Sequence, residues 1–132
     1  MVNKLAQAPR DILGRPVPGG NQLFFDRFSL AHVAVGVTAE LAAIPAPYAI
    51  GAATAFEFVE NDIKKVYGRF WPADQPDAWQ NSAGDILSFA IGYYGARAMK
   101  TDGLGRCVLV GLAAAAGALW TSELLKHGWN NK

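Results

Sequence analysis

The 132-residue chain contains little charge and almost no cysteine. Charged residues make up 17 % of it and the net charge is +1, so it lacks the basic surface of a nucleic-acid-binding domain. The single cysteine, Cys107, cannot form an internal disulfide and excludes a cysteine metal cluster. Residues 1–22 are polar and show neither the apolar segment nor the cleavage site of a secretory signal. The composition therefore disfavours a nucleic-acid-binding protein and a disulfide-stapled secreted domain.

Four apolar segments make up most of the remaining chain, and hydrophobic residues account for 52 % of the whole. Residues 33–44 offer only Thr38 and Glu40 as polar groups, and residues 108–120 contain no charge. A helix that is apolar on all sides belongs in a membrane or a deep core. Because 132 residues cannot surround two such helices, the sequence predicts an all-α integral membrane bundle of four short transmembrane helices. A soluble helix bundle is the alternative.

The predicted domain boundaries follow from these segments. An irregular arm rich in proline and glycine covers residues 1–23, and a four-helix membrane domain covers residues 24–128. The spans are predicted at residues 28–44, 47–63, 82–99 and 104–125. A bilayer core requires about 20 apolar residues, so the fourth span qualifies, the first and third are marginal, and the second is short.

The basic residues are distributed unevenly across this topology. With four spans, the amino terminus, the middle loop and the carboxyl terminus share one side of the membrane, and that side holds nine of the twelve Lys and Arg residues. Basic residues are retained on the cytoplasmic side of membranes. We therefore expect both termini in the cytoplasm.

Polar and ionisable residues recur at the helix ends that share this side. Helical spacing places Ser29, His32, Gly36 and Glu40 on one stripe, and Asn81, Asp85, Ser88, Gly92 and Gly95 on another. Polar groups at membrane depth are costly unless paired, and small residues let helices approach closely. We therefore expect the two stripes to face one another. The candidate ligand-binding or polar-network residues are His32, Glu57, Glu60, Asn61, Asn81 and Asp85.

Three interpretations of these residues stay open. The first is structural, with polar groups that bond between helices and with Asn81 or Ser82 as the N-cap of the third helix. The second is a site for a lipid headgroup, a small polar molecule or a proton relay. The third is a metal site, although no Glu-x-x-His pair is present. Its ligands would be His32, Glu57, Glu60 and Asp85. His32 could alternatively ligate a tetrapyrrole, but the sequence requires no cofactor.

Three short sequence motifs follow one another along the chain. They are Asp-Arg-Phe-Ser-x-x-His at 26–32, Glu-x-x-Glu-Asn at 57–61 and Asn-Ser-x-x-Asp at 81–85. This order resembles small polytopic bacterial membrane proteins of the VanZ-like group and related families of undefined function, over about residues 26–95. The resemblance implies a helical fold in the bacterial inner membrane and points to the same six candidate residues. It implies no established reaction.

The sequence favours a binding or structural role over catalysis, because it contains no nucleophile elbow, Walker loop or zinc motif. We expect a non-enzymatic accessory subunit that contacts lipid and packs against a larger membrane complex or a second copy of itself. One alternative is a membrane protein that binds a lipid headgroup, polar ligand or metal at the His/Glu/Asp cluster on the cytoplasmic face. Another is a phage-type membrane-permeabilising protein, which the long arm and the carboxylates fit poorly.

Overall fold

The computed structural model describes residues 23–67, 78–99 and 103–130, and all regular structure within these ranges is helical. The helices are α1 (Ser29–Leu41), α2 (Ala46–Tyr67), α3 (Trp79–Met99) and α4 (Gly103–Asn130). The prediction of an all-α chain with four helices is confirmed for the described residues. The predicted arm, apart from Leu23, lies outside them, as does most of the connection between α2 and α3.

The helices differ in length from the predicted spans. α1 has 13 residues and is the shortest, so it extends about 20 Å at 1.5 Å per residue. α2 and α4 continue beyond the predicted ends at residues 63 and 125. The predicted ends followed the loss of hydrophobicity, whereas a helix continues for as long as its backbone hydrogen bonds are made.

A residue in the left-handed conformation ends α1. Ala43 has φ of 58°, and its N–H donates to the carbonyl oxygen of Glu40 at 2.9 Å, while the N–H of Ile44 donates to that of Ala39 at 3.1 Å. This pair of bonds is a Schellman motif, in which glycine usually occupies the left-handed position. Pro45 follows and cannot continue α1, so the chain turns at once into α2.

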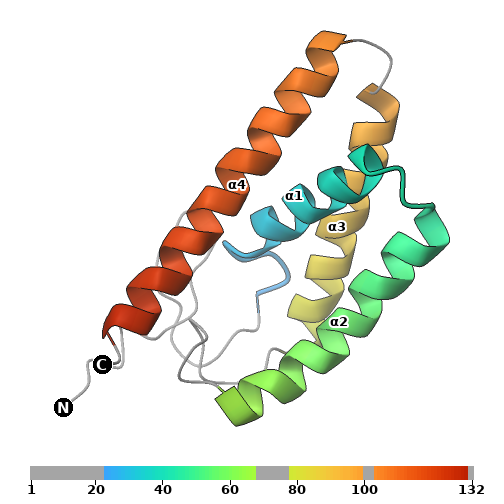
Figure 1. Ribbon diagram of the computed structural model, residues 1–132. Helices are drawn as coiled ribbons and strands as arrows, with labels where there is room; N and C mark the ends of the chain where they lie inside the picture. The colour runs from blue at the N-terminus through green and yellow to red at the C-terminus, as the bar shows by residue number, and fades with distance from the viewer. Residues whose placement is uncertain (1–22, 68–77, 100–102, 131–132) are drawn as a thin grey trace.

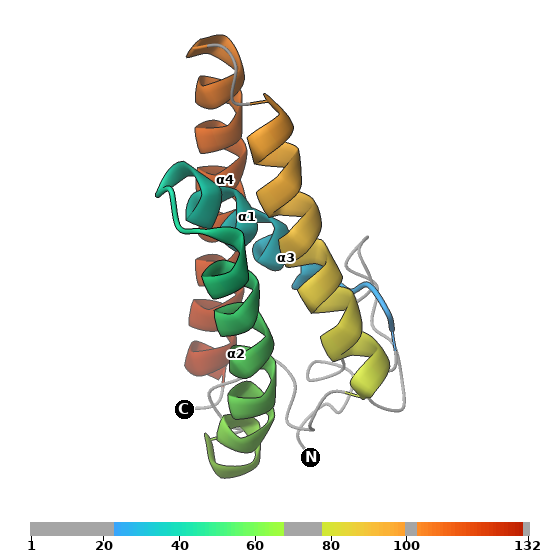
Figure 2. The same cartoon turned by 90° about the vertical axis from the view of Figure 1, so that its right-hand side faces the viewer.

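The helices form two hairpins, α1 with α2 and α3 with α4 (Figure 1). In the perpendicular view α2 and α4 run in one direction and α3 runs back between their ends in the opposite direction, whereas α1 crosses them obliquely (Figure 2). α1 packs most extensively on α3 and also contacts α4. The end of α2, the start of α3 and the end of α4 lie at one end of the molecule. The four helices are therefore not aligned along one axis, because α1 is short and lies across the others.

The interior is small and unusually polar. Among the described residues, nine buried side chains are polar or charged and eight are hydrophobic, half of the latter being alanines. The buried hydrophobic groups form two clusters, around Phe89 and Tyr93 and around Val37 and Leu109. Within the same ranges, twenty-one large hydrophobic side chains are exposed. This distribution is the reverse of that in water-soluble proteins, which bury apolar side chains and leave charged ones outside.

α4 is the most exposed helix. Its segment Gly103–Ser122 is the one stretch within the described residues that is long and apolar enough to cross a membrane, and 6 % of it is buried. Leu104 and Leu112 of this segment are 76 % and 61 % exposed. By length and composition α4 is therefore a candidate membrane span. α1 is apolar but shorter than a span requires.

Candidate functional site

The site begins in the turn that precedes α1. Oδ1 of Asp26 accepts hydrogen bonds from the backbone N–H groups of Phe28 at 2.7 Å and Ser29 at 3.0 Å. In return, Oγ of Ser29 accepts a hydrogen bond of 3.1 Å from the N–H of Asp26. This reciprocal pattern resembles a capping box placed in the turn before the N-cap residue Phe28, and it satisfies backbone donors that the start of a helix leaves unbonded. The capping box thereby fixes the start of the helix that carries His32.

Two residues of α3 bind this turn from the opposite side. The Asn81 amide, which is 1 % exposed, donates to the carbonyl oxygen of Leu23 at 3.0 Å and to Oδ2 of Asp26 at 3.2 Å. One helical turn later, Oδ1 of Asp85 accepts a 2.7 Å hydrogen bond from the hydroxyl of Ser29. Asn81 and Asp85 therefore bind both members of the capping box and anchor α1 on α3.

The N-cap role predicted for Asn81 or Ser82 is wrong. α3 begins at Trp79, so both residues already lie within its first turn. The Asn81 amide bonds across to the chain before α1. Ser82 accepts a hydrogen bond of 3.4 Å from the amide of Asn61, which connects α3 to α2. Asn61 thus contributes to the contact between α2 and α3.

Glycines bring the backbones of α1 and α3 into direct contact. A Cβ atom on Gly36 would collide with the carbonyl oxygen of Phe89, and one on Gly92 would collide with that of Val33. The two predicted stripes therefore face one another at these glycines, and that expectation is confirmed. Gly95 is an exception, because nothing lies within 4 Å of where its Cβ would be. The close approach brings the polar residues of both helices within reach of each other.

His32 lies between two carboxylates that come from different helices. Its Nδ1 is 3.6 Å from Oε1 of Glu57 on α2, and its Nε2 is 3.6 Å from Oδ2 of Asp85 on α3. The side chains of Glu57 and Asp85 are only 3 % and 4 % exposed, and that of His32 is 19 % exposed. One ligand atom from each of the three residues lies within 4.8 Å of the others. Three of the four residues predicted as metal ligands therefore converge.

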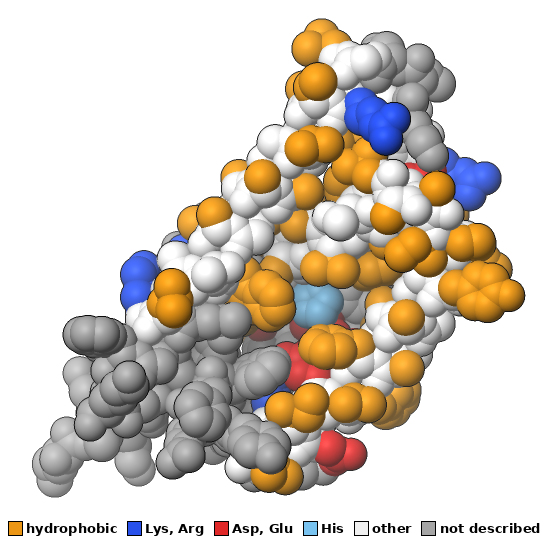
Figure 3. Space-filling view, viewed as in Figure 1, with side chains coloured by type: hydrophobic (Ala, Val, Ile, Leu, Met, Phe, Trp, Pro, Cys, Tyr) orange, Lys and Arg blue, Asp and Glu red, His pale blue; other side chains and the backbone are white. Residues whose placement is uncertain are grey.

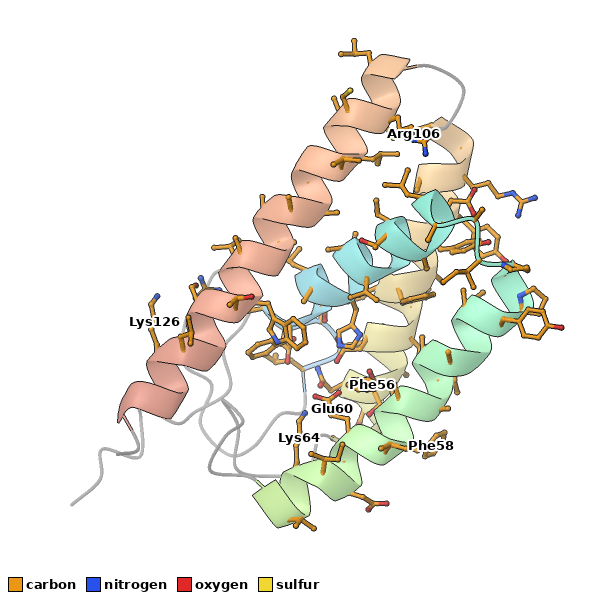
Figure 4. The ribbon with its side chains drawn as sticks, in the orientation of Figure 1. Phe56, Phe58, Glu60, Lys64, Arg106 and Lys126 are labelled. Carbon is orange, nitrogen blue, oxygen red and sulfur yellow. The ribbon has the colours of Figure 1, made fainter. Side chains whose placement is uncertain are left out.

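Glu60, the fourth predicted metal ligand, lies outside this group. Its Oε1 is 3.2 Å from Nζ of Lys64, one turn further along α2. Figure 4 shows both side chains directed from α2 toward the interior, whereas Phe58 points away. Residues three positions apart on a helix are rotated by about 60° from each other. Because of this rotation, Glu57 faces His32 and Glu60 faces the lysine.

A cavity of about 480 Å³ lies beside the cluster, between α1, α2 and α3. Figure 3 shows acidic and histidine side chains inside a hollow that hydrophobic side chains surround. Among the described residues, the polar lining consists of Asp26, His32, Glu60, Lys64, Asn81 and Asp85. The remaining lining residues are apolar or aromatic, among them Val35, Ala53, Phe56 and Phe89. Its volume falls within the range of about 300–1,000 Å³ typical of small-molecule sites.

Glu40 shares a predicted stripe with His32 but belongs to a separate polar group. It is buried near the end of α1 and, with Tyr93 and Arg97, lines a second cavity of about 320 Å³. The hydroxyl of Tyr93 donates a 2.7 Å hydrogen bond to the carbonyl oxygen of Ile44. The polar stripe on α1 therefore contributes His32 to one polar group near the start of the helix and Glu40 to another near its end.

Sequence reasoning left Asp26, Ser29 and Lys64 out of the candidate residues, although each has a detectable signal. Asp26-x-x-Ser29 has the spacing of a capping box. Glu60 and Lys64 are oppositely charged and four positions apart, which places them side by side on a helix. Helix starts and i, i+4 pairs are therefore informative about this site.

Comparison of the chain with models of protein families, with curated proteins and with solved structures finds no match. The hydroxyl of Ser29 is bonded to Asp85 rather than to His32, so the imidazole does not activate it as a nucleophile. Carboxylates, an imidazole and an amide beside an apolar cavity suit the binding of a ligand with one polar end.

Proposed function

We propose that this is an integral protein of the bacterial inner membrane that binds an amphiphilic ligand in the cavity between α1, α2 and α3. The observation that carries the proposal is the reversed distribution of side chains, with polar groups buried and large hydrophobic groups exposed. Hydrocarbon is the solvent in which this distribution is favourable, because polar side chains in a membrane turn toward the protein interior. The order of the three motifs also leads us to propose a relationship to the VanZ-like group.

In this proposal α4 is the principal membrane span. α2 and α3, with 22 and 21 residues, extend about 30 Å each and match the thickness of a bilayer core. α1 crosses only part of that thickness, and the hairpin that it forms with α2 returns to the side from which it entered. Both termini then lie in the cytoplasm, in agreement with the distribution of Lys and Arg.

The shape of the cavity identifies the class of ligand. Its apolar wall accommodates a hydrocarbon chain, and its polar end presents carboxylates, an amide and an ammonium group to a headgroup. Carboxylates accept hydrogen bonds and an ammonium group donates them. A hydroxyl headgroup can do both, so we propose a single-chain amphiphile with a hydroxyl-bearing headgroup.

Photocrosslinking tests this proposal directly. The protein in lipid nanodiscs is incubated with a diazirine-bearing monoacylglycerol, irradiated, and digested to locate the label. We expect labelled peptides from α2 and α3, and reduced labelling when Ala53→Phe fills part of the cavity. Ala55→Phe is the matched control, because Ala55 is exposed on the same helix and does not line the cavity. Equal labelling of both variants would contradict the proposal.

A second candidate function is that of an accessory subunit of a larger membrane complex. Its support comes from three exposed aromatic residues, Tyr48, Phe58 and Trp79, which are 73–74 % exposed. Aromatic residues of this kind often dominate protein interfaces. If the protein is a subunit, extraction in mild detergent yields a complex whose mass falls to that of the single chain in the Phe58→Ala and Trp79→Ala variants. A wild-type chain that runs alone argues against it.

A further inference from the structure

We propose that His32, Glu57 and Asp85 bind one divalent transition-metal ion, of the class of Zn²⁺ or Mn²⁺. The three side chains come from three different helices and meet beside the cavity, which His32 and Asp85 line. The inference rests on the proposed function in one respect, because both use the same cavity.

One separation within the cluster is close to that between two ligands of the same ion. Oδ2 of Asp85 lies 3.6 Å from Nε2 of His32, and two ligand atoms bound tetrahedrally to Zn²⁺ at about 2.0–2.2 Å lie about 3.3–3.6 Å apart. Oε1 of Glu57 lies 3.6 Å from the other ring nitrogen, Nδ1, and an ion binds only one nitrogen of an imidazole. Ligand atoms of all three residues nevertheless lie within 4.8 Å of one another. A single ion therefore requires rotation of the imidazole or of the Glu57 side chain to complete the site.

The chemistry of the three groups matches the same class of ion. A neutral imidazole and two carboxylates together carry two negative charges, equal and opposite to those of a divalent cation. Imidazole favours Zn²⁺ and related transition metals, and carboxylates extend the range to Mn²⁺. Binding of a cation would also stabilise two carboxylates that are almost completely buried.

Ser29 positions one of the three ligands. Its hydroxyl donates to Oδ1 of Asp85, and Oδ2 is the oxygen that faces His32. Hydrogen bonds of this kind orient metal-binding carboxylates, and their loss typically weakens metal binding by about 10- to 100-fold. Asp26 and Asn81 in turn hold Ser29 and the start of α1 in place. Ser29 is therefore a positioning residue for the metal site.

Three protein ligands leave a coordination position open, as in zinc sites that bind a water molecule or a substrate. His32 and Asp85 both line the cavity, so an ion held by them would adjoin the space assigned to the amphiphile. An oxygen atom of the headgroup could occupy the open position. The ion would then recognise the polar end of the ligand, while the apolar wall holds its chain.

Metal binding can be measured without any knowledge of the amphiphile. The purified chain is stripped with EDTA, dialysed against Zn²⁺ or Mn²⁺, and analysed for metal per chain by mass spectrometry. We expect one ion per wild-type chain and none in His32→Ala, Glu57→Gln or Asp85→Asn. Glu60→Gln is the matched control, a carboxylate one turn from Glu57 but outside the cluster, and it should retain the ion.

Two further measurements exclude misfolding as the cause of a loss. Ser29→Ala leaves all three ligands in place and should weaken Zn²⁺ binding by about 10- to 100-fold. Replacement of the ion with Co²⁺ should give visible absorption bands that Asp85→Asn removes, while circular dichroism shows an unchanged helix content. A wild-type chain that binds no ion, or cluster variants that bind it as well as wild type, would overturn the inference.

The same samples separate this inference from the proposed function. Photolabelling of the cavity in a chain that binds no metal would overturn the metal site and leave the amphiphile proposal intact. Stoichiometric metal without photolabelling would overturn the amphiphile proposal alone.

Discussion

The hydroxyl of Ser29 on α1 and the carboxylate of Asp85 on α3 are joined by a hydrogen bond of 2.7 Å across 56 positions of the sequence. A hydrogen bond to a charged group contributes about 1.5–3 kcal/mol to stability. We expect a double-mutant cycle with Ser29→Ala and Asp85→Ala to give a coupling energy in this range, measured by unfolding in detergent. The pair Ser29→Ala and Glu40→Ala should be additive, because these residues lie at opposite ends of α1.

The contact between α1 and α3 predicts a strong difference between two glycines of α3. Gly92→Ala forces a Cβ atom into the carbonyl oxygen of Val33, and we expect it to destabilise the protein by about 1–3 kcal/mol. Gly95→Ala meets open space and should be neutral or stabilising by up to about 1 kcal/mol. Thermal unfolding of the two variants under identical conditions measures the difference, and similar melting temperatures would contradict the observed packing.

The left-handed conformation of Ala43 predicts a substitution that stabilises the protein. Ala43→Gly removes the Cβ atom that disfavours this conformation, and the gain should be about 0.5–1 kcal/mol after the greater flexibility of unfolded glycine is included. Ala42→Gly is the control, because Ala42 has φ of −77° and gains nothing from glycine. Chemical or thermal unfolding should therefore rank Ala43→Gly above wild type and Ala42→Gly below it.

The proposed topology predicts which ends of α4 can be labelled from outside the cell. Gly103 is exposed at the start of α4, and Lys126 lies about 35 Å further along near the opposite end, as Figure 4 shows for Arg106 and Lys126. In a Cys107→Ser background, a membrane-impermeant maleimide should label Gly103→Cys in intact spheroplasts. In the same background, Lys126→Cys should react only after permeabilisation. The opposite pattern would place both termini outside the cytoplasm.

The sequence predicts the helices of this protein better than their arrangement. Four apolar segments separated by turn residues are sufficient to predict four helices. The glycine and serine positions also predict that α1 and α3 face each other, because small residues at helical spacing mark a close contact. The oblique course of α1 could not be predicted, since it depends on the short turn around Ala43 and on packing against two helices at once.

Most residues of the candidate site could also be predicted from the sequence. Which of the two glutamates on α2 meets His32 could not. His32, Glu57 and Asp85 are among the residues singled out from the sequence, and they converge. Sequence spacing alone cannot decide between Glu57 and Glu60, because both lie on the inward side of α2 and the rotation of that helix determines which one meets His32. In the structure Glu60 pairs with Lys64, and Glu57 is the residue that faces His32.

The three residues of the proposed metal site lie on two parts of the molecule that can move relative to each other. The glycine contact joins α1 and α3 into one part, and α2 forms the other. α1 and α3 touch through their backbones at Gly36 and Gly92, so His32 and Asp85 are held as if on one rigid body. Glu57 belongs to α2, which joins that body through a short turn and packs on it less extensively. A hinge movement of α2 would therefore displace Glu57 and leave His32 and Asp85 fixed. The distance between His32 and Glu57 would then report how far the cavity is open.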